Sequence, residues 1–247
     1  MNFIGDYHTH SEYSHGKGNL RKNIEMAIKM GLQELAITDH GPASWNFIRL
    51  GVKNQEELLF IKEKIALLQE EYPQIKLYSG VEANIINEDG ELDVSEKILS
   101  QLDIVAAGFH LLIFPESFKS TRDIIINNRI IYRYFRNKRN DIRRRNTEIL
   151  IKAVSKNSIN FITHPGYKVD IDTYQLAKAC AEENTYLEIN ARHGLLTEGF
   201  IRTAAETDVK FIVNSDSHSP EEIGEFSFVN KLIARLKISR ERIVNLR

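Results

Sequence analysis

Short runs of β-branched and aliphatic residues alternate with helix-like segments along nearly the whole chain, and this alternation constrains the fold most. We predict seven strands, at residues 4–8, 34–38, 76–81, 104–108, 160–163, 186–189 and 210–214, with 242–244 as a candidate short eighth. Helices are expected near residues 20–30, 55–71, 95–101, 121–156, 173–183, 198–207 and 221–236. Seven consecutive βα units indicate a parallel sheet, either open or closed into a barrel.

Chain length and charge narrow the class of protein further. The 247 residues fit one large α/β barrel better than two small domains, and the net charge of -1 gives no overall field toward nucleic acid or membrane. The single cysteine, Cys180, excludes an intramolecular disulfide and a cysteine-based metal cluster. No apolar run is long enough to span a bilayer, and the N-terminus has no basic region followed by an apolar stretch. We therefore expect a cytoplasmic protein without a membrane partner.

Side chains of the metal-ligand type gather where the predicted strands end. Six of the seven predicted strands end in His, Glu or Asp: His8 and His10 at the first, His40 at the second, Glu82 at the third, His110 at the fourth, His164 at the fifth, and Asp216 and His218 at the seventh. His15 lies a few residues past the first strand. Because a strand alternates its side chains, His8 and His10 should point the same way, and Asp216 and His218 should repeat that geometry.

The joint pattern favours a metal site over isolated core histidines. A single buried histidine is commonly a hydrogen-bonded core residue, so no one position decides the matter. In a closed barrel, however, the carboxyl ends of all strands meet at one face, and these side chains would converge there. Imidazoles and carboxylates without thiolates suit zinc, iron or manganese, and nine ligands are enough for two or three ions.

Seven motifs, in order along the chain, resemble the PHP family (polymerase and histidinol phosphatase), most of all its YcdX-type stand-alone phosphatase branch. They are His8-Thr9-His10, Thr38-Asp39-His40-Gly41-Pro42, Gly80-Val81-Glu82-Ala83-Asn84, Ala107-Gly108-Phe109-His110, Thr163-His164-Pro165-Gly166, Leu187-Glu188-Ile189-Asn190 and Ser215-Asp216-Ser217-His218. The resemblance implies an α/β fold, a distorted (β/α)7 barrel similar to a TIM barrel. It also implies a single PHP-type hydrolase domain over residues 1–247.

The resemblance also implies a set of metal ligands, which would hold three divalent ions, zinc first, with manganese or iron as alternatives. His8, His10, Glu82 and Asp216 would hold one ion, Glu82, His110 and His164 a second, and His15, His40 and His218 a third. Glu82 would bridge the first two ions, and Glu82, Asp216 and His218 would act in catalysis through the metals. Zinc lowers the pKa of bound water from about 15.7 to about 7, so we expect a metal-bound hydroxide to attack phosphorus in a small phosphomonoester.

Residues outside the ligand set have weaker assignments. Arg192 and His193 could face the substrate, because an arginine fork matches phosphate, or they could be solvated loop residues. Asp39 and Asn190 could orient ligands or serve as turn and cap residues, and Glu188 could be a structural carboxylate inside the barrel.

A basic insertion is expected near residues 115–150. Between Lys119 and Arg145 it carries ten Lys and Arg residues against Asp123 and Asp141, together with Tyr132, Tyr134 and Phe135. We favour a long amphipathic helix with a solvated basic face. A lid that brings arginines toward phosphate and a nucleic-acid surface are the alternatives.

Other functions remain open beside phosphomonoester hydrolysis of a small phosphorylated substrate. A phosphodiesterase or exonuclease could use the same metals, so nucleic acid stays an alternative partner that the overall charge does not favour. An amidohydrolase also begins with His-x-His, but it often bridges its metals with a modified lysine, where this chain offers Glu82, and His15 would have no role. A non-catalytic metal-binding domain would not need a complete ligand set. The sequence does not define the oligomeric state.

Overall fold

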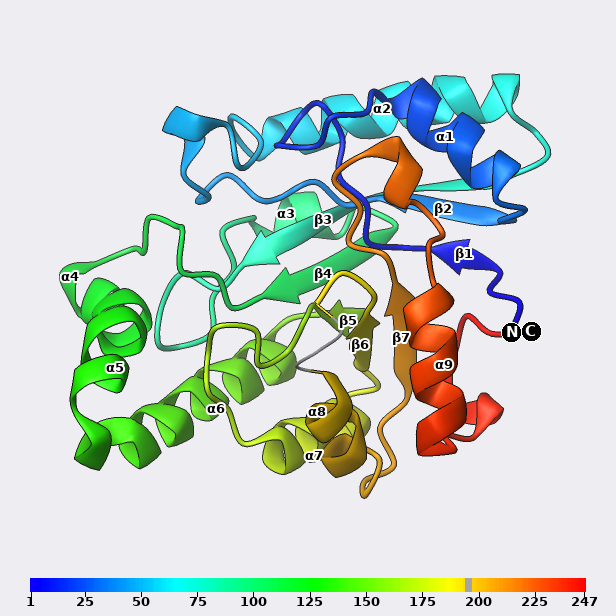
Figure 1. Ribbon diagram of the computed structural model, residues 1–247. Coiled ribbons are helices and arrows are strands. Elements are labelled where there is room, and N and C mark those ends of the chain that lie inside the picture. The colour runs from blue at the N-terminus through cyan, green and yellow to red at the C-terminus, as the bar shows by residue number, and fades with distance from the viewer. Residues whose placement is uncertain (194–196) are drawn as a thin grey trace.

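Seven parallel strands form one sheet in the order in which they occur in the chain (Figure 1). The computed structural model describes residues 1–193 and 197–247. The strands are β1 (Gly5–Asp6), β2 (Glu34–Ile37), β3 (Lys76–Asn84), β4 (Ile104–Gly108), β5 (Phe161–Ile162), β6 (Tyr186–Asn190) and β7 (Phe211–Asn214). Each strand pairs in parallel with the next. The predicted distorted (β/α)7 barrel is confirmed.

The barrel closes between β7 and β1 without a regular ladder. Asn214 accepts a hydrogen bond from the Tyr7 backbone N–H at 3.0 Å, and Asp6 accepts one from Ser215 at 3.1 Å. Further along, Thr9 and Ser217 form a single parallel bridge. Because side chains replace ladder bonds at this seam, β1 is shorter than the predicted strand at 4–8.

The C-terminal segment fills the lower part of the same seam, beside the N-terminus (Figure 1). The side chain of Asn245 donates to the carbonyls of Gly5 and Val213, at 3.1 and 2.7 Å. The candidate eighth strand at 242–244 is reduced to one bridge, between Ile243 and Phe211. Hydrogen bonds from one side chain to the backbone of two strands leave no alternating pattern in the sequence, so they could not be predicted from it.

Helices surround the sheet and bury the outward faces of the strands (Figure 1). They are α1 (Leu20–Lys29), α2 (Glu56–Glu71), α3 (Glu96–Leu99), α6 (Arg139–Lys156), α7 (Thr173–Glu182), α8 (Thr197–Ala204) and α9 (Ser227–Leu236), with short turns η1 (Asn46–Ile48), η5 (Pro220–Glu222) and η6 (Arg240–Arg242). Asn54 accepts a hydrogen bond from the Glu57 N–H at 3.0 Å, and Ser219 heads a capping box, as their positions before helices suggest. Ser95 makes no side-chain capping bond. No helix within the described residues is long and apolar enough to cross a bilayer.

A small hydrophobic cluster fills the inside of the barrel, below the ligand-type side chains at the carboxyl ends of the strands. Its buried members are Tyr7, Ala36, Ala106, Phe161 and Ile212. The strand register places Glu82 beside Ala106, Ala106 beside Phe161, and Glu188 beside Ile212, so both glutamates share this inner face. Glu82 therefore lies inside β3, which continues to Asn84 and past the predicted end at residue 81.

The basic insertion folds into two helical arms, so the single helix predicted over 121–156 is wrong. The first arm comprises α4 (Phe118–Ser120), the π-helical η2 (Thr121–Ile131) and α5 (Tyr132–Tyr134), and the short η3 (Arg136–Lys138) leads into α6, the second arm. Phe135, with φ -118° and ψ 87°, interrupts the helix between the two arms. Asn128 and Asn146 exchange hydrogen bonds of 3.0 and 2.8 Å between the buried faces of the arms, which satisfies both amides at once.

Many cations of the insertion have protein partners. Arg122 and Arg145 both pair with Asp123, Arg143 lies 3.6 Å from Asp172, and Lys119 pairs with Glu88. Pairing to local carboxylates leaves less of the basic surface for an external anion. The solvated amphipathic interpretation fits this arrangement better than a nucleic-acid surface does.

Candidate metal centre

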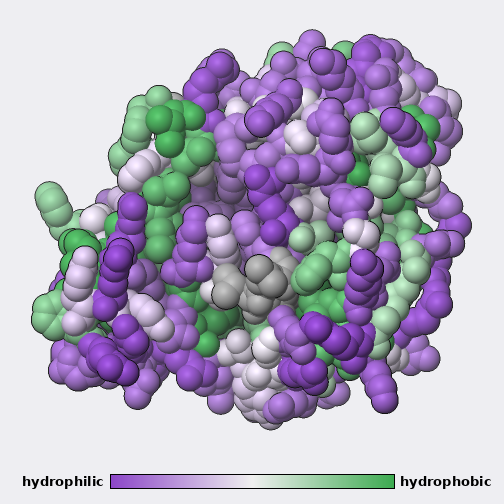
Figure 2. All heavy atoms as spheres, in the orientation of Figure 1, coloured by the Kyte–Doolittle hydropathy of each residue, from purple (hydrophilic) through white to green (hydrophobic). Residues whose placement is uncertain are grey.

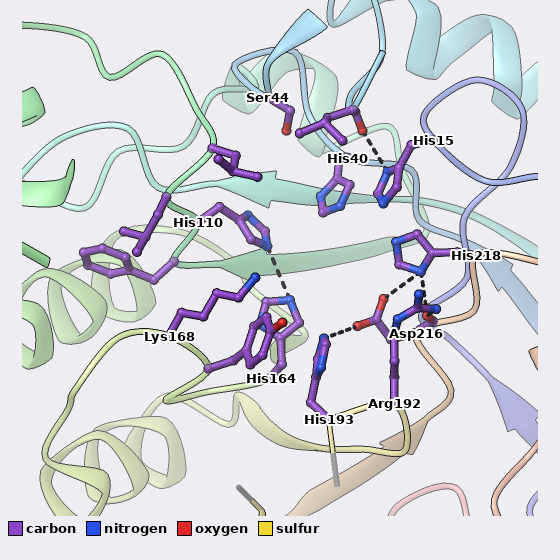
Figure 3. Close-up of a pocket in the computed structure, with 15 residues that line it drawn as sticks. His15, His40, Ser44, His110, His164, Lys168, Arg192, His193, Asp216 and His218 are labelled. Atoms are coloured by element: carbon purple, nitrogen blue, oxygen red, sulfur yellow. Dashed lines mark hydrogen bonds and ion pairs between the residues drawn. The ribbon is translucent and has the colours of Figure 1, made fainter. Parts of the chain in front are cut away.

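Six of the nine predicted ligand residues line one pocket at the carboxyl end of the barrel, namely His15, His40, His110, His164, Asp216 and His218 (Figure 3). The other three, His8, His10 and Glu82, are buried beside them. Loops after β1, β2, β4, β5 and β7 bring in the histidines and Asp216, and β3 itself brings in Glu82. Asp216 has a positive φ of 55°, so it does not continue β7 in the extended geometry that we predicted. The bridge between Thr9 and Ser217 nevertheless sets Asp216 and His218 beside His8 and His10.

Four ligand atoms form a compact first group. His8 Nε2 lies 3.2 Å from Glu82 Oε2 and 3.6 Å from Asp216 Oδ1. His10 Nε2 lies 3.6 Å from Glu82 Oε2 and 3.4 Å from Asp216 Oδ1. Tetrahedral zinc with bonds of about 2.0–2.1 Å holds its ligand atoms about 3.3 Å apart, so these spacings suit a zinc ion at the centre of the group.

The other oxygen of Glu82 faces a second group. Glu82 Oε1 lies 3.1 Å from His110 Nε2 and 2.9 Å from His164 Nε2, and these two nitrogens lie 3.3 Å apart. One carboxylate thus presents each of its oxygens to a different pair of imidazoles. This is the geometry of a ligand that could bridge two ions.

The third group is less separate from the first two. His15 lies with its ring centroid 5.0 Å from that of His40 and 4.1 Å from that of His218. His40 Nδ1, however, lies 2.8 Å from Glu82 Oε2, and ligand atoms of His10, His40 and His218 lie within 4.8 Å of one another. His40 could therefore serve either the third ion or the bridge region.

Several atoms in these groups are buried without a hydrogen-bond partner. They are His8 Nε2, both ring nitrogens of His10, His40 Nδ1 and Glu82 Oε2. A buried polar atom left unsatisfied costs about 1–3 kcal/mol. Several such atoms aimed at common points fit cation binding, and the donor set of imidazole and carboxylate fits zinc, manganese or iron.

The two carboxylates and several of the histidines have protonation states that suit cations. Burial alone would raise the pKa of Glu82, but the surrounding His40, His8 and His110 hold it well below its usual range. Burial raises the pKa of Asp216 too, and His8 and its other histidine neighbours outweigh that effect. Burial lowers the pKa of His110 to about 4 and that of His15 to about 3. Burial also lowers the pKa of His8 and of His164, but the neighbouring Glu188 and Glu82 outweigh it, so the pKa of both imidazoles is raised. Metals require anionic carboxylates and neutral imidazoles, so these two histidines would release a proton when an ion binds.

Buried groups behind the ligands fix how they point. Glu188, which we predicted to be a structural carboxylate inside the barrel, lies with Oε1 2.7 Å from His8 Nδ1. Asn190 donates to Asp216 Oδ2 at 3.1 Å, which is the contact that the ligand-orienting interpretation of Asn190 requires. Asp39 instead accepts hydrogen bonds from Ser11 and Ser14 and anchors the loop that carries His15. Groups of this kind set the tautomer and direction of a metal-binding histidine.

One wall of the pocket is cationic and aromatic. Arg192 pairs with Glu222 at 2.9 Å and also lines the pocket, and His193 lies 3.3 Å from Asp216 Oδ2 and stacks on Tyr167 with ring centroids 3.7 Å apart. Lys168 lines the same wall with its ammonium 4.5 Å from the Tyr167 ring centroid (Figure 3). It makes no ion pair within the described part of the chain.

Sequence reasoning missed Lys168 and Tyr167. Lys168 has a φ of 59°, a left-handed conformation that is uncommon for a residue other than glycine and is often found at functional sites. The only signal in the sequence was the short distance from His164, which by itself does not distinguish a pocket residue from a surface one.

Comparisons with known proteins agree with this geometry. The family model described as "PHP domain" matches residues 6–192. The chain belongs to the PHP domain family. It is 31% identical to a "Probable phosphatase" of Shewanella pealeana, with 99% of this chain and 89% of that protein covered, and 30% identical to one of Thermoanaerobacter sp. (strain X514), with 99% and 91% covered. Asp216 and His218 lie beyond the residues that the PHP family model matches.

Solved structures show the same fold at lower sequence identity. A histidinol phosphate phosphatase of Lactococcus lactis, solved in complex with zinc, L-histidinol and phosphate, is 19% identical with a TM-score of 0.65, and the match covers 96% of this chain and 94% of that one. A chain in an archaeal ribonuclease P structure is 14% identical with a TM-score of 0.54, covering 94% and 85%. At these identities the likeness shows the PHP barrel alone.

Proposed function

We propose that this PHP protein hydrolyses a small-molecule phosphomonoester with three bound divalent ions, zinc before manganese or iron. The enzyme is a phosphoric ester hydrolase, in keeping with relatives that carry the name probable phosphatase. The observation that carries the proposal is the position of Glu82. Its two oxygens lie within 3.2 Å of His8 on one side and within 3.1 Å of His110 on the other.

In this proposal the ligands divide as follows. His8, His10, Glu82 and Asp216 hold the first ion, Glu82, His110 and His164 the second, and His15, His40 and His218 the third. When bound by these residues, the ions would supply a hydroxide nucleophile near neutral pH and would neutralise negative charge on the phosphate. The whole chain, 1–247, acts as one PHP-type hydrolase domain with the insertion on its flank.

The chain's own residues would bind and orient the ester. Lys168 and Arg192 flank His164 and His193 in the pocket and would face the non-bridging phosphate oxygens (Figure 3). A guanidinium can grip two phosphate oxygens at once, whereas the ammonium acts as a point charge. His193, held by Asp216 and Tyr167, would donate a hydrogen bond to the phosphate or to the departing alcohol.

Matched esters and a bridge variant test the proposal. Metal-free protein should be inactive and regain turnover when zinc or manganese is added, and p-nitrophenyl phosphate should be cleaved faster than bis-p-nitrophenyl phosphate. Elemental analysis should show that the Glu82→Ala variant loses two ions together. The control variant Glu63→Ala, on the exposed face of α2, should keep all three ions. Faster cleavage of the diester would favour a phosphodiesterase instead. Full metal content in Glu82→Ala would remove the proposed bridge.

A further inference from the structure

One part of the pocket lining, the apolar wall, consists of aliphatic and aromatic side chains. Leu50, Phe109, Leu111 and Leu112 line it, and they come from the loops after β2 and β4. The cationic residues come from the loops after β5 and β6. The cavity of about 250 Å³ is therefore lined by apolar and by cationic side chains as well as by the histidines.

The apolar wall continues outward from the pocket as an aromatic strip. Trp45 N–H donates to the Leu112 carbonyl at 3.1 Å, and Ser44 and Ile113 form an antiparallel bridge, so the two loops run side by side. The strip consists of Trp45, Phe47 and Phe114, with Trp45 and Phe47 ring centroids 5.3 Å apart and Phe47 and Phe114 centroids 6.4 Å apart.

The two phenylalanines of this strip are open to solvent, whereas Trp45 is half-buried and has the Arg129 guanidinium 5.9 Å from its ring centroid. Phe47 is 70% exposed and Phe114 is 58% exposed. Figure 2 shows hydrophobic residues gathered at the upper left of the molecule, over η1 and the start of the insertion. Contiguous exposed apolar surface beside a pocket is typical of a ligand-binding groove.

The apolar wall offers little that could bind hydroxyl groups. Apart from the histidines, Ser44 is the one polar residue that these two loops contribute to the lining within the described chain, and its hydroxyl already contacts Asn84. A polyhydroxylated alcohol placed here would lose hydrogen bonds to water without replacing them. An apolar alcohol would instead gain by leaving water.

We propose that the substrate is a phosphomonoester of an apolar or aromatic alcohol. This rests on the proposed function and names its substrate class. The phosphate faces Lys168 and Arg192, and the carbon skeleton lies on Leu111 and Leu112 and extends toward Trp45. In the reaction, water adds to phosphorus, the bond from phosphorus to the alcohol oxygen breaks, and the alcohol leaves with one proton of that water.

Two primary alkyl esters of similar intrinsic reactivity test this class. The metal-loaded enzyme should show a kcat/KM at least about tenfold higher for 2-phenylethyl phosphate than for glycerol 1-phosphate, the lower range of discrimination by an apolar contact. Leu112→Asn should reduce that ratio mainly by raising KM for the phenylethyl ester. Leu67→Asn, an equally conservative change on the exposed face of α2, should leave the ratio unchanged.

Binding of non-hydrolysable analogues gives a readout independent of turnover. In calorimetry, 2-phenylethylphosphonate should bind more tightly than 2,3-dihydroxypropylphosphonate, and Leu112→Asn should abolish the difference. Equal binding and equal turnover of the two pairs would overturn the substrate class, even while p-nitrophenyl phosphate is cleaved. Loss of turnover with every ester, including p-nitrophenyl phosphate, would overturn the proposed function itself.

Discussion

Asn84 accepts a hydrogen bond from His110, with 2.8 Å between Asn84 Oδ1 and His110 Nδ1. The amide cannot turn over freely, because its nitrogen donates to Asp93 Oδ2 at 2.6 Å and to Ser44 Oγ at 3.1 Å. His110 therefore carries its proton on Nδ1 and directs the lone pair of Nε2 toward Glu82. Asp93 thus determines the tautomer of His110 through a neutral amide.

Replacing this amide should weaken metal binding. We expect Asn84→Leu to lower zinc affinity at the second group by about 10–100-fold, as is usual when the partner of a metal-binding histidine is removed. Titration of metal-free protein against a competing chelator measures the loss. Asn146→Leu is the control: it removes a buried amide between the two arms of the basic insertion and should lower stability without changing zinc affinity. Equal affinities in Asn84→Leu and the wild type would contradict the role of Asn84.

Asp93 should make the unfolding free energy of the metal-free protein depend on pH. Burial raises the pKa of Asp93 to about 6, against an ordinary value of 3.8. Between these values the folded state binds more protons than the unfolded state, so this group's contribution to stability falls as pH rises from about 4 to 6 and stays constant above that. The fall is on the order of 3 kcal/mol.

The Asp93→Asn variant should not show this loss of stability between about pH 4 and pH 6. We would measure urea unfolding of both proteins with chelator present at pH 4, 5, 6 and 7 and take the difference between their unfolding free energies. The difference should shift in favour of the variant as pH rises toward 6. Parallel pH profiles would show that Asp93 titrates normally and that its burial has no such effect.

Lys168 should act on the substrate and not on the metals. We expect Lys168→Met to lower kcat/KM for a phosphomonoester by about 10–100-fold, because a phosphate contact of this kind contributes roughly 1.5–3 kcal/mol. Metal content and melting temperature should stay at the wild-type level, since the side chain is exposed. Lys178→Met on α7 provides the matched control. Unchanged kinetics would remove Lys168 from the phosphate site.

Phe161 should support the site from below. It is fully buried inside the barrel, with its ring centroid 6.3 Å from that of His8. Phe161→Ala should cost about 3–5 kcal/mol of unfolding free energy, measured by chemical denaturation. Phe118→Ala, at a position that is 96% exposed, should change it by less than about 0.5 kcal/mol. Similar values for the two variants would mean that the barrel interior can collapse around the lost ring.

The sequence predicted the strand positions and the meeting of the ligand residues because both follow from local patterns. Buried parallel strands read as short apolar runs, and a barrel brings their carboxyl ends to one face, so His40, His110 and His164 could be placed before any coordinates. The same logic located Glu82, although β3 extends three residues further than we predicted.

Features that depend on long-range contacts could not be read in this way. The break at Phe135 follows from packing between the two arms of the insertion, and no Pro or Gly marks it. Asp216 adopts a left-handed conformation that no spacing rule predicts. Lys168 and Leu112 become pocket residues only because loops distant in sequence meet above the histidines.

Because the seam between β7 and β1 is incomplete, bound cations would also stabilise the closure of the barrel. His8 and His10 follow the first strand, Asp216 and His218 follow the last, and few backbone hydrogen bonds join the two sides. Ions bound by these four side chains would hold the segment after β1 against the segment after β7. Removal of the metal should then speed amide hydrogen exchange at Thr9 and Ser217 before it speeds exchange in the outer helices. Metal binding would in that case complete the catalytic site and close the barrel at the same time.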